Sequence, residues 1–188
     1  MNLSPVISVI FSVSLLSVFT GCSSGVDAAG GATIRSMTLG RSASLGPAPI
    51  EATGFEPLGT LTLFKAGNEI YGREPWVLDG TPDGTMMLRN IGPGAFGSSP
   101  GVANDVGFTV LGNHAYFAAN DWVNGIELWR TDGTTEGAEL FAEFVPGPDG
   151  IWYISDAAVA GNKMFLTVRS QVDVPIHTWV IEDHGLEP

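Results

Sequence analysis

Two short acidic segments of this 188-residue chain carry the residue types of a calcium-binding loop. In each segment oxygen-bearing residues alternate with others ahead of a glycine: Asp79, Thr81 and Asp83 before Gly84, and Asp132, Thr134 and Glu136 before Gly137. Calcium takes several oxygen ligands from one tight loop, and Glu143 falls at the twelfth position of the second segment. The alternative is a hairpin turn, with Gly80 or Gly133 at positive φ and the Asp side chain accepting backbone hydrogen bonds. We favour the turn, because no helical pattern flanks either segment, and keep calcium as an alternative.

A glutamate recurs two residues before a tryptophan, as Glu74 and as Glu127. A repeated glutamate can line an opening and bind a ligand there. More often such a side chain accepts hydrogen bonds from neighbouring backbone or lies in solvent. We therefore expect both glutamates to have a structural role.

Aromatic side chains supply a second candidate chemistry, because an exposed indole can stack on a sugar ring. The chain has five tryptophans, at positions 76, 122, 129, 152 and 179. Trp76 and Trp129 occupy equivalent positions of a repeat described below, so we expect them to pack in a core. Trp122 and Trp152 remain as candidates for binding a glycan.

Other common sites are missing from the sequence. The three histidines, at positions 114, 177 and 184, lack metal-type spacing, and neither a His-Glu-x-x-His nor a phosphate-loop motif occurs. We predict no enzymatic activity, no bound metal and no catalytic residues. Eight Lys and Arg against 20 Asp and Glu give a net charge of −12, which argues against nucleic-acid binding.

The first residues read as an export signal. Residues 6–19 are apolar or small and uncharged, too short to span a bilayer, and they lead into Phe19-Thr20-Gly21-Cys22. This segment resembles a bacterial lipobox, which implies lipidation of Cys22, the only cysteine, and a lipoprotein held by its acyl chains in the outer membrane. The alternatives are plain secretion or a buried apolar strand.

An internal repeat determines the predicted architecture. Residues 54–97 align without a gap on 107–150, and 16 of the 44 positions are identical. Gly, Trp, Asp-Gly-Thr and Pro-Gly recur at a shift of 53 residues, and a degenerate third copy follows over 151–188.

The second copy shows four segments with strand patterning, at 108–112, 114–120, 126–132 and 138–144. Four short antiparallel strands in about 50 residues, written repeatedly, are typical of a propeller blade. A single blade cannot bury both faces, so we expect Trp76 and Trp129 to pack against a neighbouring blade.

The segments 72–85 and 125–138 resemble the bacterial ELWxxDGT repeat. On this resemblance Glu74, Trp76, Asp79, Gly80 and Thr81, and their counterparts Glu127, Trp129, Asp132, Gly133 and Thr134, are the repeat's structural residues. The resemblance implies a propeller-like β-structure in an exported, hyalin-like bacterial protein, and it brings no catalytic residues.

The predicted fold is therefore all-β, with antiparallel four-stranded blades in an incomplete or open three-blade arc. A six-blade homodimer and a remnant of a longer array are the alternatives. The predicted organisation is a signal peptide at 1–21, a flexible tether at 22–31, an N-terminal strand and linker at 32–53, and a β-repeat domain at 54–188, with blades at 54–106, 107–150 and 151–188.

The predicted function is that of a lipid-anchored, non-enzymatic binding module of the bacterial cell envelope, whose partner is a protein or a glycan. The sequence leaves three alternatives: a calcium- or glycan-binding propeller, an enzyme with its site in loops at one end of the blades, and a truncated longer repeat protein.

Overall fold

The computed structural model describes residues 49–81, 83–98, 107–170 and 177–182, which all fall in the compact unit Thr38–Pro188. The signal peptide, Cys22 and the tether lie outside the described residues, as do residues 32–48 of the predicted N-terminal strand and linker, and His184. In the part that is described, every regular element is a β-strand except one 3₁₀ turn, η1 (Gly94–Phe96).

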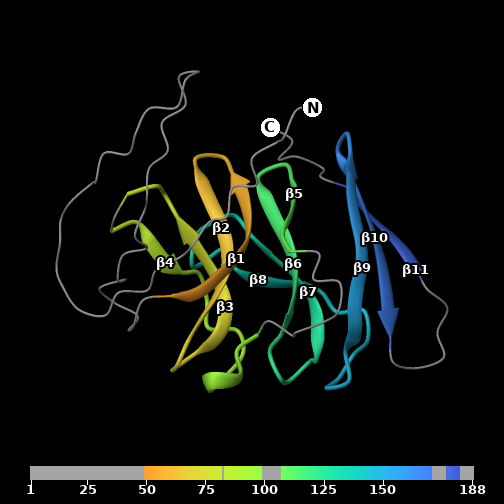
Figure 1. Cartoon of the computed structure of the whole chain (residues 1–188). Helices are drawn as coiled ribbons and strands as arrows, with labels where there is room; N and C mark the ends of the chain where they lie inside the picture. Colours follow the sequence, from red (N-terminus) through yellow and green to blue (C-terminus); the bar gives the residue numbers. More distant parts are fainter. Residues whose placement is uncertain (1–48, 82, 99–106, 171–176, 183–188) are drawn as a thin grey trace, which may run out of the picture. The chain divides into compact units, whose positions relative to one another are not determined.

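The strands form three antiparallel sheets that follow one another along the chain (Figure 1). Sheet 1 holds β1 (Ile50–Leu58), β2 (Leu61–Asn68), β3 (Gly72–Leu78) and β4 (Thr85–Met87); sheet 2 holds β5 (Thr109–Leu111), β6 (His114–Asn120), β7 (Ile126–Thr131) and β8 (Glu139–Ala142); sheet 3 holds β9 (Ile151–Ala160), β10 (Lys163–Ser170) and β11 (His177–Glu182). A single residue pair, Ile126 with Ile151, joins sheets 2 and 3. The all-β antiparallel prediction is confirmed, and the described residues form no closed propeller.

Sheets 1 and 2 have the same strand register. Phe64 pairs with Trp76 in sheet 1, and Phe117 pairs with Trp129 at the same positions of sheet 2. The four strand segments predicted for the second copy are all observed, each shortened by at most three residues. The sequence repeat is therefore also a structural repeat.

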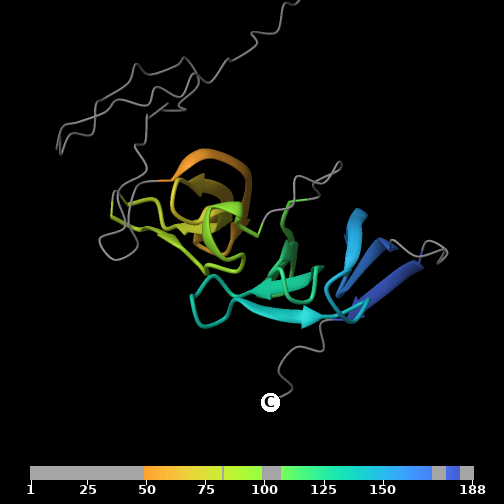
Figure 2. The same ribbon diagram turned by 90° about the horizontal axis from the view of Figure 1, so that it is seen from below.

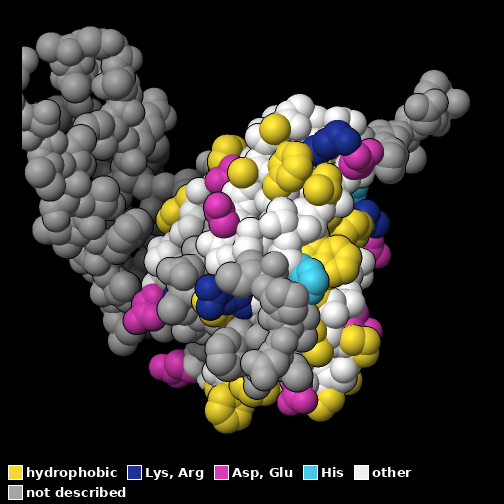
Figure 3. All heavy atoms as spheres, turned by 90° about the vertical axis from the view of Figure 1, so that its right-hand side faces the viewer, with side chains coloured by type: hydrophobic (Ala, Val, Ile, Leu, Met, Phe, Trp, Pro, Cys, Tyr) yellow, Lys and Arg dark blue, Asp and Glu magenta, His cyan; other side chains and the backbone are white. Residues whose placement is uncertain are grey.

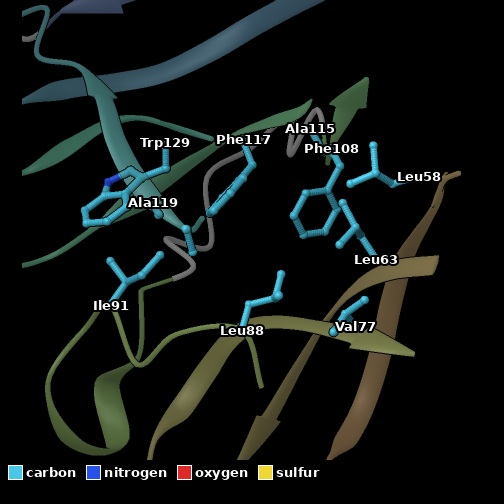
Figure 4. Packing of buried hydrophobic residues seen from close by; sticks show 11 residues of the cluster. Leu58, Leu63, Val77, Leu88, Ile91, Phe108, Ala115, Phe117, Ala119 and Trp129 are labelled. Carbon is cyan, nitrogen blue, oxygen red and sulfur yellow. The ribbon is translucent and has the colours of Figure 1, made fainter. Parts of the chain in front are cut away.

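Each sheet has two packing faces, which we name by what they cover. The back face carries the repeated Phe and Trp, and the front face carries side chains from the alternate positions. Sheet 1 turns its front face to the back face of sheet 2, and the two meet in one buried cluster (Figure 4). That cluster contains Leu58, Leu63, Val77, Leu88 and Ile91 from the sheet 1 side, and Phe108, Ala115, Phe117, Ala119, Trp129 and Ala138 from the sheet 2 side.

The front face of sheet 2 packs in turn on the back face of sheet 3. Tyr116 and Leu128 come from sheet 2, and Met164 and Leu166 come from sheet 3. Figure 2 shows the three sheets side by side in chain order, each facing the next. Face-to-face burial of apolar side chains stabilises a protein by about 25 cal/mol per Å², so neighbouring sheets stabilise one another.

The back face of sheet 1 has no preceding sheet among the described residues, yet Phe64 and Trp76 on it are buried. Part of the cover comes from β1, which is irregularly paired to β2 at two places. Ala52 packs against this cluster, and the Phe55 ring stacks on Phe64 with 5.4 Å between ring centroids. The extended β1 thus caps the first sheet, as terminal units of repeat proteins require.

Candidate functional site

Glu74 and Glu127 are fully buried, and each carboxylate binds the backbone that follows the fourth strand of its own sheet. The donors are the N–H groups of Ile91 (3.2 Å) and Gly92 (2.9 Å) for Glu74, and of Phe144 (2.6 Å) and Val145 (3.1 Å) for Glu127. Since these donors are also 53 residues apart, the two sheets contain the same interaction, which we call the carboxylate clamp. The clamp fixes the start of the connection to the next sheet.

Burial raises the pKa of both carboxyl groups from 4.5 to about 7, although the hydrogen bonds oppose the shift. The Ser98 hydroxyl donates a further hydrogen bond to Glu74. Glu127 lacks that donor, and the negative charges of Glu143 and Asp121 raise its pKa further. Both carboxyl groups are buried and hydrogen-bonded to backbone, so we assign them a structural role.

The two Asp-Gly-Thr segments form hairpin loops between the third and fourth strands. Oδ1 of Asp79 accepts hydrogen bonds from the Thr81 N–H (2.8 Å) and hydroxyl (2.7 Å). Asp132 does the same with the N–H (2.9 Å) and hydroxyl (2.7 Å) of Thr134. The hydroxyl donors lower the pKa of both aspartates below the usual range. The carboxylates thus stabilise the turn that holds them.

Glycines complete these loops. Gly80 and Gly133 have φ of 86° and 91°, which a side chain would disfavour. A Cβ on Gly84 would come within 1.6 Å of Asp79 Oδ1, and Gly137 is packed in the same way. Among the described residues, no group of three or more His, Cys, Asp or Glu side chains could hold a metal ion.

Trp76 and Trp129 both lie in buried clusters, but their indole nitrogens differ. Nε1 of Trp76 donates to the Ala66 carbonyl at 3.0 Å. Nε1 of Trp129 is buried without a hydrogen-bond partner within the described structure. The Arg89 guanidinium lies over the Trp129 ring, 5.5 Å from its centroid. Both rings therefore pack in the core, where Trp76 is hydrogen-bonded to the neighbouring strand β2 and Trp129 contacts the Arg89 guanidinium.

An exposed aromatic pair lies elsewhere, at the end of sheets 1 and 2 where β6 turns into β7; Phe55, Phe165 and Trp179 are exposed at other places. Trp122 is 55 % exposed and Phe96 of η1 is 82 % exposed, and their ring centroids are 5.8 Å apart. Val123 beside them is exposed as well. We call these three residues the aromatic platform. Aromatic residues are usually buried, so a paired exposed set marks a candidate binding surface.

The platform is rigidly mounted at the junction of the two sheets. The Trp122 indole N–H donates to the Gly97 carbonyl at 2.9 Å, and its backbone N–H donates to Asn120 Oδ1 at 2.7 Å. The next residue, Ser98, binds sheet 1 through the Arg73 carbonyl (3.0 Å) and sheet 2 through the Asn120 N–H (2.8 Å). Trp122 also has a φ of 63°, a strained backbone conformation for a bulky residue. These contacts fix the indole while leaving much of its surface in solvent.

Polar groups flank the platform. Asp121 accepts hydrogen bonds from the N–H groups of Val123 (2.9 Å) and Asn124 (2.7 Å). Burial alone would raise the pKa of Asp121, but these hydrogen bonds outweigh it and keep the pKa below the usual range. The Asn124 side-chain amide donates to the other carboxylate oxygen, Oδ2, at 2.8 Å, so both oxygens of Asp121 accept hydrogen bonds within this turn.

The sequence singled out Trp122 but not Phe96. A comparison of the two copies would have identified both residues. Trp122 occupies the position of Glu69 in the first copy, and Phe96 occupies the position of Asp149 in the second copy. An aromatic residue in only one copy is not required by the repeated fold. Trp152 lies in β9, where its side chain is not described. His114 begins β6 and His177 begins β11, in different sheets.

Comparison with known proteins adds no family. No family model matches the chain, and no curated protein or solved structure matches it. Among the described residues, no helix is long and apolar enough to cross a membrane.

Proposed function

We propose that this chain is a lipid-anchored, non-enzymatic interaction module of the bacterial envelope, built as an open, propeller-like arc of ELWxxDGT-type blades. The arc is supported by two copies with one register and by sheets that stack front to back. The observation that carries the binding role is the aromatic platform, which is exposed yet fixed by hydrogen bonds to both sheets.

The anchor rests on the lipobox-like sequence that ends at Cys22. Fractionation of bacterial cells that produce the full chain tests it. Wild-type protein should sediment with the outer membrane, and Cys22→Ser should move it to the soluble periplasmic fraction. Equal membrane association of both forms would refute the anchor.

Glycan binding is a second, more specific function that the aromatic platform favours. The hydrogen-bonded indole offers a flat apolar surface for the C–H face of a sugar. The neighbouring Asp121 carboxylate accepts hydrogen bonds within its own turn and keeps further lone pairs that can accept hydrogen bonds from sugar hydroxyl groups. Because the ring is already ordered, little side-chain entropy is lost on binding.

Titration calorimetry with chitohexaose, cellohexaose and xylohexaose tests the glycan hypothesis. Trp122→Ala should weaken binding about tenfold or more, which corresponds to about 1.4 kcal/mol. Ile70→Ala is the matched control, because Ile70 is an exposed residue in the equivalent turn of sheet 1. No heat of binding with any of the three sugars, or equal affinity of both variants, would count against this ligand class.

A further inference from the structure

Sheets 1 and 2 each have a fourth strand that carries an aliphatic residue opposite the repeated tryptophan. Met87 of β4 pairs with Trp76, and Leu140 of β8 pairs with Trp129. Each aliphatic residue packs in the same buried cluster as its tryptophan. Trp76 is 1 % exposed and Trp129 is 5 % exposed. The fourth strand therefore helps to shield the indole from water.

Sheet 3 has the tryptophan, but β11 is the last strand in its order, and among the described residues only β10 pairs with β11. Trp179 pairs with Leu166 on β10, as Trp76 pairs with Phe64 on β2, so the two indoles occupy equivalent positions. Trp179 is nevertheless 46 % exposed, although the Phe144 ring lies 5.0 Å from it between centroids. Figure 3 views the molecule from the side of β10 and β11, where hydrophobic side chains reach the surface.

The third strand of sheet 3 is more similar to that of sheet 1 than to that of sheet 2. Trp179-Val180-Ile181 matches Trp76-Val77-Leu78, whereas sheet 2 has Trp129-Arg130-Thr131. The arginine of sheet 2 forms an ion pair with Glu139 of its fourth strand. In sheet 1 the valine and the tryptophan pair instead with Met86-Met87. A segment that suits β11 therefore has aliphatic side chains at two successive positions, as β4 has.

The backbone of β11 has the polarity that a fourth strand needs. In sheet 1 the Pro75 carbonyl accepts a hydrogen bond from the Leu88 N–H at 2.9 Å. By the alternation of an antiparallel ladder, Pro75 and Val77 direct their backbone groups toward β4. Thr178 and Val180 occupy the equivalent positions of β11, because β10 and β11 pair in the register of β2 and β3. Their N–H and C=O groups thus face the outer edge.

This outer edge has few of the features that keep exposed strands from pairing. Such edges are usually protected by proline, lysine or a bulge. β11 reads His-Thr-Trp-Val-Ile-Glu and pairs with β10 without a register shift. Its one acidic side chain, Glu182, forms an ion pair with Lys163 on β10. The six residues of β11 are therefore a regular edge to which a strand can be added.

We propose that the outer edge of β11 binds an extended segment of another protein, which adds a fourth strand to sheet 3 and places an aliphatic side chain opposite Trp179. The backbone groups of Thr178 and Val180 form the ladder with this segment. Its aliphatic side chain shields the indole, as Met87 does for Trp76 in sheet 1.

The two strands of this kind in the described part of the chain, β4 and β8, already pair within their own sheets. The added strand therefore comes from another molecule. The site lies on a different sheet from the aromatic platform, so it gives the chain a second binding surface, for a polypeptide.

Fluorescence anisotropy tests the proposal with a labelled synthetic peptide of residues 83–90, which contains β4 and carries no net charge. The full chain carrying Cys22→Ser, in a mild detergent, should bind this peptide saturably. The peptide with Met87→Ser should bind about tenfold more weakly, the loss expected for one buried aliphatic side chain. No saturable binding, or equal affinity of the two peptides, would overturn the proposal.

Variants of the chain locate the binding site. Trp179→Ala should weaken peptide binding about tenfold, because the aliphatic side chain then has no indole to cover. Trp122→Ala is the matched control, since Trp122 is an exposed tryptophan of the aromatic platform, and it should leave the affinity unchanged. Equal effects of the two substitutions would place the peptide elsewhere and refute the assignment to β11.

A second test separates strand addition from simple adhesion of an apolar peptide to the indole. Val180→Pro removes the N–H that faces the outer edge but no hydrogen bond to β10, so it should abolish peptide binding while the circular dichroism spectrum stays that of the parent. Val180→Ala keeps the N–H and should weaken binding about threefold at most. Equal binding by these two variants would contradict strand addition.

Hydrogen exchange of the Val180 amide provides a readout that needs no substitution at the edge. In the Cys22→Ser chain this amide should exchange rapidly without the peptide and slowly when the peptide of residues 83–90 is present in excess. An amide that is already slow without the peptide would show that the chain itself fills the edge, and an amide that stays fast would show that no ladder forms. Either result would overturn the proposal.

Discussion

The buried carboxylate clamps predict an unusual dependence of stability on pH. The pKa of Glu74 and Glu127 is about 7 in the folded protein, against 4.5 for a free side chain. The folded state therefore binds more protons than the unfolded state between these values, so stability is greatest below pH 4.5 and falls as the pH rises to 7. At about 1.4 kcal/mol per pH unit, each carboxyl accounts for a loss of about 3 kcal/mol.

Urea denaturation followed by tryptophan fluorescence measures this effect at pH 5, 6, 7 and 8 and constant ionic strength. Glu74→Gln and Glu127→Gln cannot titrate, so each should lower the slope of unfolding free energy against pH, and the double variant should lower it further. Glu69→Gln is the control, because it removes the same charge from an exposed turn. Its slope should match that of the wild type.

Two results would refute the reasoning about the clamps. One is a wild-type stability that rises or stays constant from pH 5 to pH 8. The other is a wild-type slope that the exposed control and the two buried variants reduce equally. The second result would assign the pH dependence to the net charge of −12 instead of the buried groups.

Three further predictions concern packing and turns. Gly72→Ala should lower the free energy of unfolding by about 2 kcal/mol more than Gly54→Ala, roughly the penalty of a forced overlap. Both glycines have φ of 66°, but only a Cβ on Gly72 meets backbone, 2.4 Å from Gly97 N. Equal melting temperatures of the two variants would disprove the close approach. In urea denaturation, Trp76→Phe should lower the free energy of unfolding by about 1 kcal/mol more than Trp129→Phe. The reason is that the Trp76 indole donates a hydrogen bond to the Ala66 carbonyl, whereas the buried Trp129 indole has no such partner in the described structure. The reverse order of stability would contradict the assigned geometry. Asp132→Asn should destabilise the protein at pH 7, and this loss of stability should shrink as the pH falls toward the lowered pKa of Asp132 and the wild-type carboxylate becomes protonated; a deficit in thermal unfolding that grows as the pH is lowered from 7 would exclude this role.

The strands could be predicted because the chain contains two copies of one sequence unit, which can be compared position by position. Phe64 and Trp76 alone are ambiguous, but their recurrence as Phe117 and Trp129 around the same Gly and Asp-Gly-Thr positions fixes the unit. Period-two alternation then assigns each strand, and the turn glycines place its ends. Local chemistry repeated twice was sufficient for this part of the fold.

The contacts between distant residues could not be predicted in the same way. The clamp joins Glu74 to Ile91 and Gly92 across 17 and 18 residues, and only the path of the connection after β4 reveals it. The aromatic platform combines Phe96 with Trp122 across 26 residues that include the undescribed segment 99–106. Likewise, the irregular pairing of β1, which caps sheet 1, has no counterpart in the second copy.

In the described structure, residues 54–97 and 107–150 build the same sheet and the same carboxylate clamp. Nuclear magnetic resonance of the isotope-labelled full chain tests it through cross-strand proton contacts. We expect contacts between Phe64 and Trp76 and between Phe117 and Trp129, together with slow amide exchange at Gly92 and Val145. Helical contacts in either copy, or strand contacts in only one of them, would contradict it.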